Sequence, residues 1–250
     1  MTATAEAGFT EDGLLGGAVR LRQPRGGLRA GLDAVLLAAA IPVRPGQVLL
    51  EGGCGAGPVF LSVLARQPDL RVFAVEREPA LAALARENAA MNGVAHQVTV
   101  IEGDIADPAL LRDLPQLDHA FANPPYWPDG SAPPEALRAG ATHHGKGPSL
   151  GDWAKALAKP LAHRGSLTFV LPASRAAEAA AGLRAARCAE VFFHPLWPRA
   201  GQAAKRLLIQ GRRGGRGPDR LLPGLALHEG DGWSTAATAL LEAPRPLSWR

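Results

Sequence analysis

The segment 47–64 constrains the fold of this chain more than any other. Residues 47–51 form a short apolar run that is typical of a strand, and Gly52-Gly53-Cys54-Gly55-Ala56-Gly57 follows directly. Pro58 suits the first position of a helix whose apolar positions continue to residue 64. A strand, a glycine loop and a helix N-terminus present bare backbone to a nucleotide-type cofactor. A tight turn without a ligand is the plainer alternative.

Strand and helix patterns alternate on both sides of this segment. Apolar or alternating runs predict further strands at residues 70–75, 97–101, 117–122 and 165–172, and helices at 34–40, 79–92, 108–114, 152–161 and 173–187. Such alternation is typical of a doubly wound parallel sheet, in which ligands bind along the carboxyl ends of the strands. Residues 191–193 and 206–210 predict an antiparallel hairpin that closes the sheet.

Three acidic residues stand beside these predicted elements. Glu76 follows the strand after the glycine loop, where an acid accepts hydrogen bonds from ribose hydroxyls, or it is a solvated charge before the next helix. Asp104 follows the next strand and either accepts from a purine amino group or caps the helix at 108–114. Asp33 is placed to cap the helix at 34–40.

The run Asn123-Pro124-Pro125-Tyr126 follows the apolar strand at 117–122 and gives the predicted reaction centre. Two prolines cannot continue a sheet ladder, so the chain must turn at Asn123. The Asn123 amide and the Pro124 carbonyl are two acceptors beside the flat ring of Tyr126. This combination fits a planar aromatic amine, and an ordinary Pro-Pro turn is the alternative.

Composition narrows the class of protein and its partners. The 250 residues are 47% hydrophobic and 20% charged, as in ordinary soluble globular proteins. Two cysteines, Cys54 and Cys188, are too few for a disulfide framework and lack the neighbours of a zinc site, which favours a reducing cytosol. The sequence predicts no export signal, no membrane span and no metal; adjacent His143 and His144 are taken as loop residues.

The formal net charge of +4 and the pI of about 9.6 suit a polyanionic partner without requiring one. A late group of basic residues is a candidate for phosphate contacts, and a solvated surface patch is the equal alternative. Its members are Arg199, Lys205, Arg206, Arg212, Arg213 and Arg216.

These motifs, in this order, resemble those of class I S-adenosylmethionine-dependent methyltransferases that carry an Asn-Pro-Pro-Tyr motif. The resemblance implies a Rossmann-like, mostly parallel, doubly wound seven-stranded sheet with an antiparallel closing hairpin. It implies cofactor contacts from Gly31, Asp33, Glu51, Gly53, Gly55, Gly57, Glu76, Asp104 and Asn123, and catalysis at residues 123–126. We expect one domain over 1–250, with a lead-in or lid at 1–32, the cofactor and catalytic part at 33–172, and the hairpin with a C-terminal helix at 173–250.

From about residue 19 to residue 242 the chain resembles the bacterial tRNA1(Val) adenine-37 N6-methyltransferases, including Gly-Lys-Gly-Pro-Ser-Leu at 145–150. The resemblance implies S-adenosylmethionine as cofactor, tRNA as substrate and a cytoplasmic location. Lys146, Arg199, Lys205 and Arg206 are then the candidate RNA contacts. The family usually has Tyr at Trp233 and Leu at Gly52, and we expect Gly52 to loosen the end of its strand.

Four other functions remain open on the sequence alone. The Asn-Pro-Pro-Tyr motif also occurs in enzymes that methylate a glutamine amide in release factors. Methylation of a guanine amine in ribosomal RNA is another possible enzyme activity. A dehydrogenase would share the glycine loop but have no use for residues 123–126. A non-catalytic RNA-binding module could retain the fold.

Overall fold

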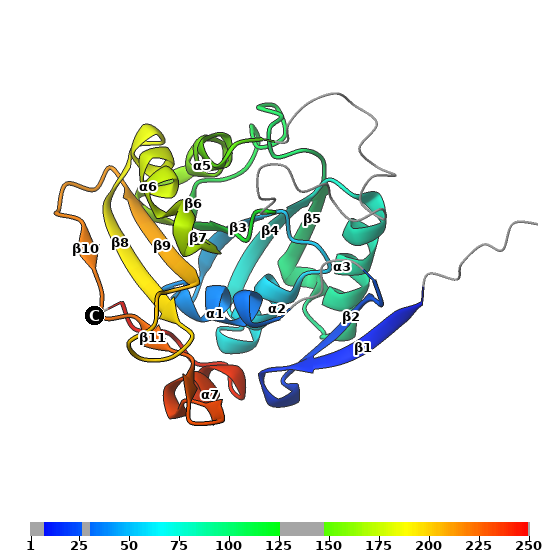
Figure 1. Ribbon diagram of the computed structural model, residues 1–250. Helices are drawn as coiled ribbons and strands as arrows, with labels where there is room; N and C mark the ends of the chain where they lie inside the picture. Colours follow the sequence, from blue (N-terminus) through cyan, green and yellow to red (C-terminus); the bar gives the residue numbers. More distant parts are fainter. Residues whose placement is uncertain (1–7, 27–30, 126–147, 250) are drawn as a thin grey trace, which may run out of the picture.

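The computed structural model describes residues 8–26, 31–125 and 148–249 and centres on one mixed sheet (Figure 1). The order of its strands is β10-β8-β9-β7-β6-β3-β4-β5, and β11 also pairs with β8. The long strands are β3 (Gln47–Gly52), β4 (Leu70–Glu76), β5 (Val98–Glu102), β6 (Leu117–Ala122), β7 (Leu161–Pro172), β8 (Cys188–Trp197) and β9 (Arg206–Arg213). The short edge strands are β10 (Arg220–Leu221) and β11 (Leu225–Ala226).

Strand directions agree with the doubly wound prediction. The four pairings among β5, β4, β3, β6 and β7 are parallel, whereas β9 runs antiparallel to both β7 and β8. The seven long strands therefore confirm the predicted sheet and its closing hairpin. The two-residue strands β10 and β11 were not expected, because so short a segment has no periodicity to detect.

Helices cover both faces of the sheet, and successive residues of the central strands are buried against opposite faces. On β3, Leu49 packs into one apolar cluster and Leu50 into the other. The first cluster includes α1 (Leu32–Ala40), α2 (Pro58–Arg66), α3 (Pro79–Met91) and α7 (Thr235–Leu241); the second includes α5 (Leu150–Ala158) and α6 (Ala176–Ala185). Burial on both faces explains why the central strands read as unbroken apolar runs.

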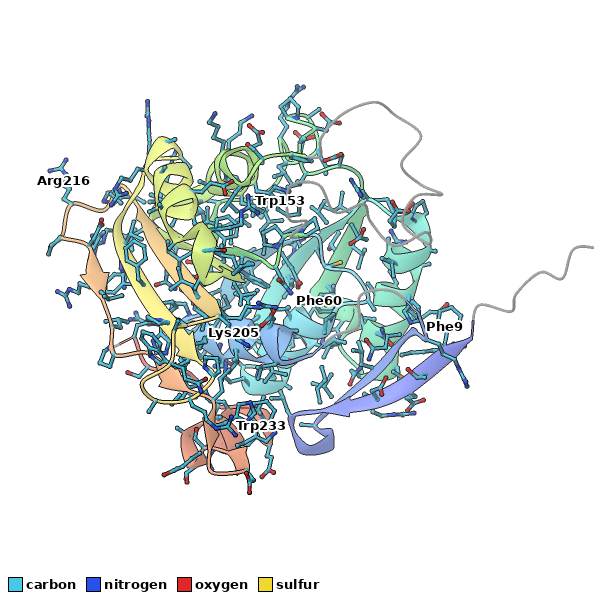
Figure 2. The ribbon with its side chains drawn as sticks, in the orientation of Figure 1. Phe9, Phe60, Trp153, Lys205, Arg216 and Trp233 are labelled. Carbon is cyan, nitrogen blue, oxygen red and sulfur yellow. The ribbon has the colours of Figure 1, made fainter. Side chains whose placement is uncertain are left out.

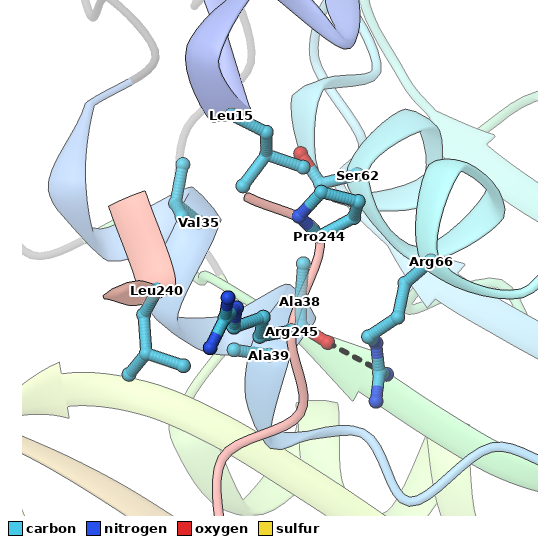
Figure 3. A pocket seen from close by; sticks show the side chains of 9 residues that line it. All are labelled: Leu15, Val35, Ala38, Ala39, Ser62, Arg66, Leu240, Pro244 and Arg245. Atoms are coloured by element: carbon cyan, nitrogen blue, oxygen red, sulfur yellow. Dashed lines mark hydrogen bonds between the residues drawn. The ribbon is translucent and has the colours of Figure 1, made fainter. Parts of the chain in front are cut away.

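The C-terminal tail holds the carboxyl end of α1. The last carbonyl groups of a helix have no partner within the helix. Arg66 donates to the carbonyls of Ala38 and Ile41, Leu247 N donates to Ala39, and Trp249 Nε1 donates to Ala40. Figure 3 shows the small pocket beside these contacts. It lies at the end of α2 that is far from the glycine loop, so it is separate from the site described below.

A short N-terminal hairpin packs on α3. It consists of β1 (Phe9–Leu14) and β2 (Val19–Pro24), which form a separate two-stranded sheet. The fully buried Asn88 of α3 accepts a hydrogen bond from Arg22 N and donates to Arg22 O, and it also donates to Ala56 O in the glycine loop. Asn88 thus ties the hairpin, α3 and the glycine loop together, a role that sequence reasoning missed. An amide on the buried face of an alanine-rich helix was the available signal.

The buried His119 of β6 predicts an acid-sensitive fold. Burial, the largest cause, lowers the pKa of His119 from 6.5 to about 4, while its ring nitrogens lie 2.8 Å from Ser166 Oγ and 3.1 Å from Gln47 Oε1. Between these pH values the unfolded chain binds more protons. Stability is therefore fully present above pH 6.5 and declines as the pH falls towards 4, with a loss of about 2 kcal/mol by pH 5.

Urea unfolding at pH 7.5 and at pH 5 measures this loss. The His119→Gln variant retains polar groups but does not titrate, so the difference between the two pH values should shrink by about 2 kcal/mol. The exposed His163 provides the control, since His163→Gln should leave the wild-type difference unchanged. An equal pH dependence in wild type and His119→Gln would contradict the assignment.

Candidate functional site

The register of the sheet brings the predicted motifs to one edge. Gly52 lies opposite Val75 of β4 on one side and opposite Ala122 of β6 on the other. All three strands are parallel, so the glycine loop, Glu76 and Asn123 leave the sheet side by side at its carboxyl edge. This is the point where the strand order reverses direction, which is where open parallel sheets bind ligands.

The glycine loop has the backbone that the sequence predicts. Gly55 (φ +56°) and Gly57 (φ +92°) adopt left-handed conformations that favour glycine. A Cβ on Gly57 would lie 2.3 Å from the Phe60 ring, whereas a Cβ on Gly55 would meet nothing within 4 Å. Gly53 (φ +64°) completes the loop, and a Cβ there would approach Trp153 to 2.9 Å. Open space at Gly55 lets a ligand approach the backbone.

Glu76 is positioned by the loop that it faces. Its side chain is buried, Oε2 accepts from Gly55 N at 2.8 Å, and Oε1 accepts from Glu78 N at 3.0 Å. Two backbone donors hold this carboxylate at the strand end. Each carboxylate oxygen has a further lone pair, so Glu76 can still accept from ligand hydroxyls.

Glu51 lies beneath the loop. It is 2% exposed, and its Oε2 accepts from Phe60 N in the first turn of α2 at 3.0 Å. Burial raises the pKa of the Glu51 carboxyl well above its usual range; the Phe60 hydrogen bond lowers it and the charge of Glu76 raises it further. Burial likewise raises the pKa of the Cys54 thiol, which makes this cysteine a packing residue. Through its hydrogen bond to Phe60 N, Glu51 fixes the start of α2 against the glycine loop.

Asp104 stands one strand further along the same edge. Glu102 lies opposite Glu76 in the register, and the exposed Asp104 accepts from Ala106 N at 2.9 Å. The predicted helix at 108–114 is wrong, because this stretch forms turns. Asp104 therefore caps a turn, and its carboxylate remains at the carboxyl edge next to Glu76.

The predicted reaction centre follows β6 without a break. Asn123 is partly buried, Pro124 is buried and Pro125 is exposed. Tyr126 lies outside the described residues. Asn123 thus leaves the sheet beside the glycine loop in a partly buried position, and the Tyr126 part of the prediction stays a prediction.

The start of α1 differs from expectation. Gly31, with an extended backbone (φ −147°), occupies the N-cap position, so the prediction that Asp33 caps this helix is wrong. Asp33 lies in the first turn, and its Oδ2 accepts from Arg206 Nε at 2.9 Å. The pair joins α1 to the first residue of β9 over 173 positions of sequence. No local pattern could have predicted it.

The basic residues divide into two groups. Arg206 lies opposite Pro172 at the carboxyl edge, whereas Arg212, farther along the same strand, lies opposite Ser166 at the amino edge. Figure 2 shows Arg216 pointing into solvent well apart from Lys205. The predicted single cluster of six is therefore wrong, because the two ends of β9 separate its members. Arg199, Lys205 and Arg206 stay with the candidate site, and Lys146 lies outside the described residues.

Gly52 ends β3 in a closely packed position, and the prediction that it loosens the strand stays a prediction. Gly52 is buried, and a Cβ at this position would lie 3.0 Å from both Trp153 and Leu157 of α5. The large Trp153 side chain occupies the volume that a residue at 52 would otherwise fill. The departure at Gly52 is thus matched by the packing of α5.

Metal ligation and membrane spanning can be assessed for residues 8–26, 31–125 and 148–249 of the structure. Within these ranges no three His, Cys, Asp or Glu side chains gather as a metal site would need. Among the same residues no helix is both long and apolar enough to cross a bilayer.

The arrangement fits a nucleoside-bearing cofactor. The left-handed glycine turn has free space beside Gly55, and the N-terminus of α2 follows this turn. The buried carboxylate of Glu76 is fixed by a hydrogen bond from Gly55 N. These features give a ligand close access to the backbone of the loop and supply an acceptor for ribose hydroxyls.

Comparisons with known proteins agree with this fold. A family model described as a precorrin methyltransferase domain matches residues 28–123. The solved structure of a predicted O-methyltransferase from Agrobacterium tumefaciens is similar, with a TM-score of 0.71 at 22% identity, covering 86% of this chain and 98% of that one. A SAM-dependent O-methyltransferase from Thermotoga maritima has a TM-score of 0.54 at 19% identity, covering 78% and 69% of the two chains. The protein has the class I S-adenosylmethionine-dependent methyltransferase fold.

Sequence relatives identify the family within this class. The tRNA1(Val) (adenine(37)-N6)-methyltransferase of Aeromonas hydrophila is 33% identical over 207 residues, which cover 82% of this chain and 84% of the relative. The protein of that name from Actinobacillus succinogenes is 29% identical over 76% of this chain and 78% of its own length. A release factor glutamine methyltransferase from Moorella thermoacetica is 42% identical over 85 residues, only 34% of this chain and 29% of that relative. The chain belongs to the tRNA1(Val) (adenine(37)-N6)-methyltransferase family.

Proposed function

We propose that this protein methylates the N6 amine of an adenine in a tRNA, using S-adenosylmethionine. The observation that carries the proposal is the register that sets Asn123 beside the glycine loop and Glu76 at one edge of the sheet. Family membership over more than four fifths of the chain supports adenine-37 of a tRNA1(Val)-like substrate as the target. A tRNA substrate implies that the protein acts in the cytoplasm.

The residues that would hold the cofactor lie along the crevice. Backbone groups of Gly53, Gly55 and Gly57 would face it, Glu76 would accept from the ribose, and Asp104 would accept from the adenine. Gly31 and Asp33, at the start of α1, would border its amino-acid end. When bound, S-adenosylmethionine supplies an activated methyl group on a sulfonium with a neutral leaving group.

Asn123 and Pro124 would do the chemical positioning. The lone pair of an adenine N6 is delocalised into the ring, and the transition state needs it localised on a pyramidal nitrogen. Two acceptors, the Asn123 side-chain oxygen and the Pro124 carbonyl, would bind the two N6 hydrogens and favour that geometry. Pro125 fixes the turn, and Tyr126 would stack on a base that has left its RNA loop. No strong base is required, because alignment supplies much of the rate.

We further propose one domain over 1–250, in which residues 1–32 lead in to the site, 33–172 bind cofactor and catalyse, and 173–250 close the sheet. The packing of β1 and β2 on α3, together with the contact from Asn88 to the glycine loop, supports a lead-in coupled to the cofactor part.

RNA binding should depend on the basic residues at the carboxyl edge. Lys205 is exposed there, whereas the exposed Arg216 lies beyond the other end of β9. Each cation that neutralises a phosphate releases condensed counterions. Lys205→Ala should therefore weaken tRNA binding and lower the salt slope by about one unit. Filter binding of tRNA across a salt series measures both quantities.

Arg216→Ala removes the same charge from the opposite edge and is the matched control. It should retain the wild-type affinity and slope, and both variants should bind S-adenosylmethionine normally. Equal losses in the two variants would mean that net charge alone attracts RNA. A flat salt response of the wild type would contradict an RNA substrate.

A further inference from the structure

An exposed aromatic pair lies outside the crevice and has no part in the proposed chemistry. The short strands β12 (His228–Glu229) and β13 (Gly232–Trp233) form a hairpin in which His228 lies opposite Trp233. The two rings stack with centroids 4.3 Å apart and an angle of 20° between their planes. Trp233 is nevertheless 45% exposed, which makes it one of three large exposed apolar side chains in the described ranges, with Phe9 and Leu221.

This hairpin is fixed to the turn that joins β8 and β9. His228 N donates to Pro198 O at 3.0 Å, and Arg199 Nη2 donates to Gly230 O at 2.9 Å. On its other side Ser234 Oγ donates to Ala226 O and accepts from Ala237 N, so the residue after Trp233 also caps α7. The backbone on both sides of Trp233 is thus fixed, and the His228 ring packs against the indole.

Two cationic residues belong to the β8–β9 turn to which the hairpin is fixed. Arg199 bonds the hairpin itself, and Lys205 lies in the same β8–β9 turn (Figure 2). A rigid exposed ring beside solvated cations suits a ligand that has a flat face and negative charge. Single-stranded nucleic acid has both, since every base presents a π-face next to a phosphate.

We propose that Trp233 is a stacking platform for an unpaired base of the RNA substrate, distinct from the base that is methylated. The proposal rests on the proposed function. β11, which leads into the hairpin, is four strand positions from β6, and a spacing of about 4.8 Å per strand puts it about 19 Å from the strand of Asn123. A separation of that size fits a nucleotide several positions away from the target adenine. His228 supports the ring from below, and Arg199 binds the adjoining phosphate.

The test compares Trp233→Ala, Trp233→Leu and Trp233→Phe in full-length protein, with unmodified tRNA as the probe. Stacking on an aromatic ring contributes about 1–3 kcal/mol per base, so the Ala and Leu variants should raise the KM for tRNA about 5- to 150-fold with little change in kcat. The Phe variant should remain within about threefold of wild type, because it keeps a π-face. Leu221→Ala removes another exposed apolar side chain and should have no effect.

Fluorescence separates stacking from a structural role. Binding of tRNA should quench part of the tryptophan emission of the wild type, and this part should be missing from Trp233→Phe while binding persists. Normal tRNA affinity in Trp233→Ala, or equal losses in the Leu and Phe variants, overturns the platform alone. A wild type that neither binds nor methylates tRNA overturns the proposed function and the platform together.

Discussion

Replacing Asn123 by alanine should lower kcat for tRNA methylation by about 100-fold or more, because it removes one of two acceptors aimed at the reacting amine. Cofactor binding should change little, since Asn123 follows β6 whereas the glycine loop and Glu76 belong to β3 and β4. The KM for tRNA should also change little, because the contact gains its strength in the transition state. Single-turnover transfer of labelled methyl measures the effect directly.

Asn92→Ala is the matched control for this variant. The side-chain amide of Asn92 has a structural role instead. It forms hydrogen bonds with the backbone of Arg20 on the N-terminal hairpin, far from the reaction centre. It should lower stability and leave kcat at the wild-type value. If Asn123→Ala transfers methyl at the wild-type rate, the two-acceptor mechanism is wrong.

Replacing Glu76 by alanine should weaken S-adenosylmethionine binding by about 100-fold. The change removes a charged acceptor for ribose hydroxyls, which contributes about 1.5–3 kcal/mol for each hydrogen bond. It also leaves Gly55 N and Glu78 N without their acceptor, so the glycine loop loses the carboxylate that fixes it. Calorimetric titration of the variant with S-adenosylmethionine gives the affinity.

Glu87→Ala is the control for charge, since Glu87 is exposed on α3 and forms a surface ion pair with Arg22 at 3.4 Å. It should bind the cofactor normally. A dissociation constant for Glu76→Ala within about threefold of wild type would remove Glu76 from the ribose role and leave it as a residue that only positions the loop.

Local patterns in the sequence predicted the parts of this fold that depend on neighbouring residues. Apolar runs predicted the parallel strands, and the glycine spacing predicted the turn at Gly55 and Gly57, because both follow from backbone sterics and burial. Parallel strands align their carboxyl ends, so the meeting of Glu76 and Asn123 was also predictable.

Contacts between distant segments were not predictable. Aspartate is a common residue at helix N-caps, yet Asp33 pairs with Arg206, which the tertiary structure brings to the start of α1. The six basic residues are close in sequence, but an extended strand separates its ends by about 3.3 Å per residue, so Arg206 and Arg212 face opposite edges. The local sequence at Gly52 indicated a loosened strand end. The Trp153 side chain that packs beside Gly52 belongs to a helix about a hundred positions away, so no local pattern could reveal this contact.

The most direct test of the central claim is transfer of labelled methyl from S-adenosylmethionine to competing acceptors under one set of conditions. The acceptors are an unmodified tRNA1(Val) transcript, the same transcript with guanine at position 37, a release factor and ribosomal RNA. We predict label at N6 of adenine-37 in the first transcript and background levels in the others. Faster methylation of the release factor, or equal methylation of both transcripts, would contradict the assignment.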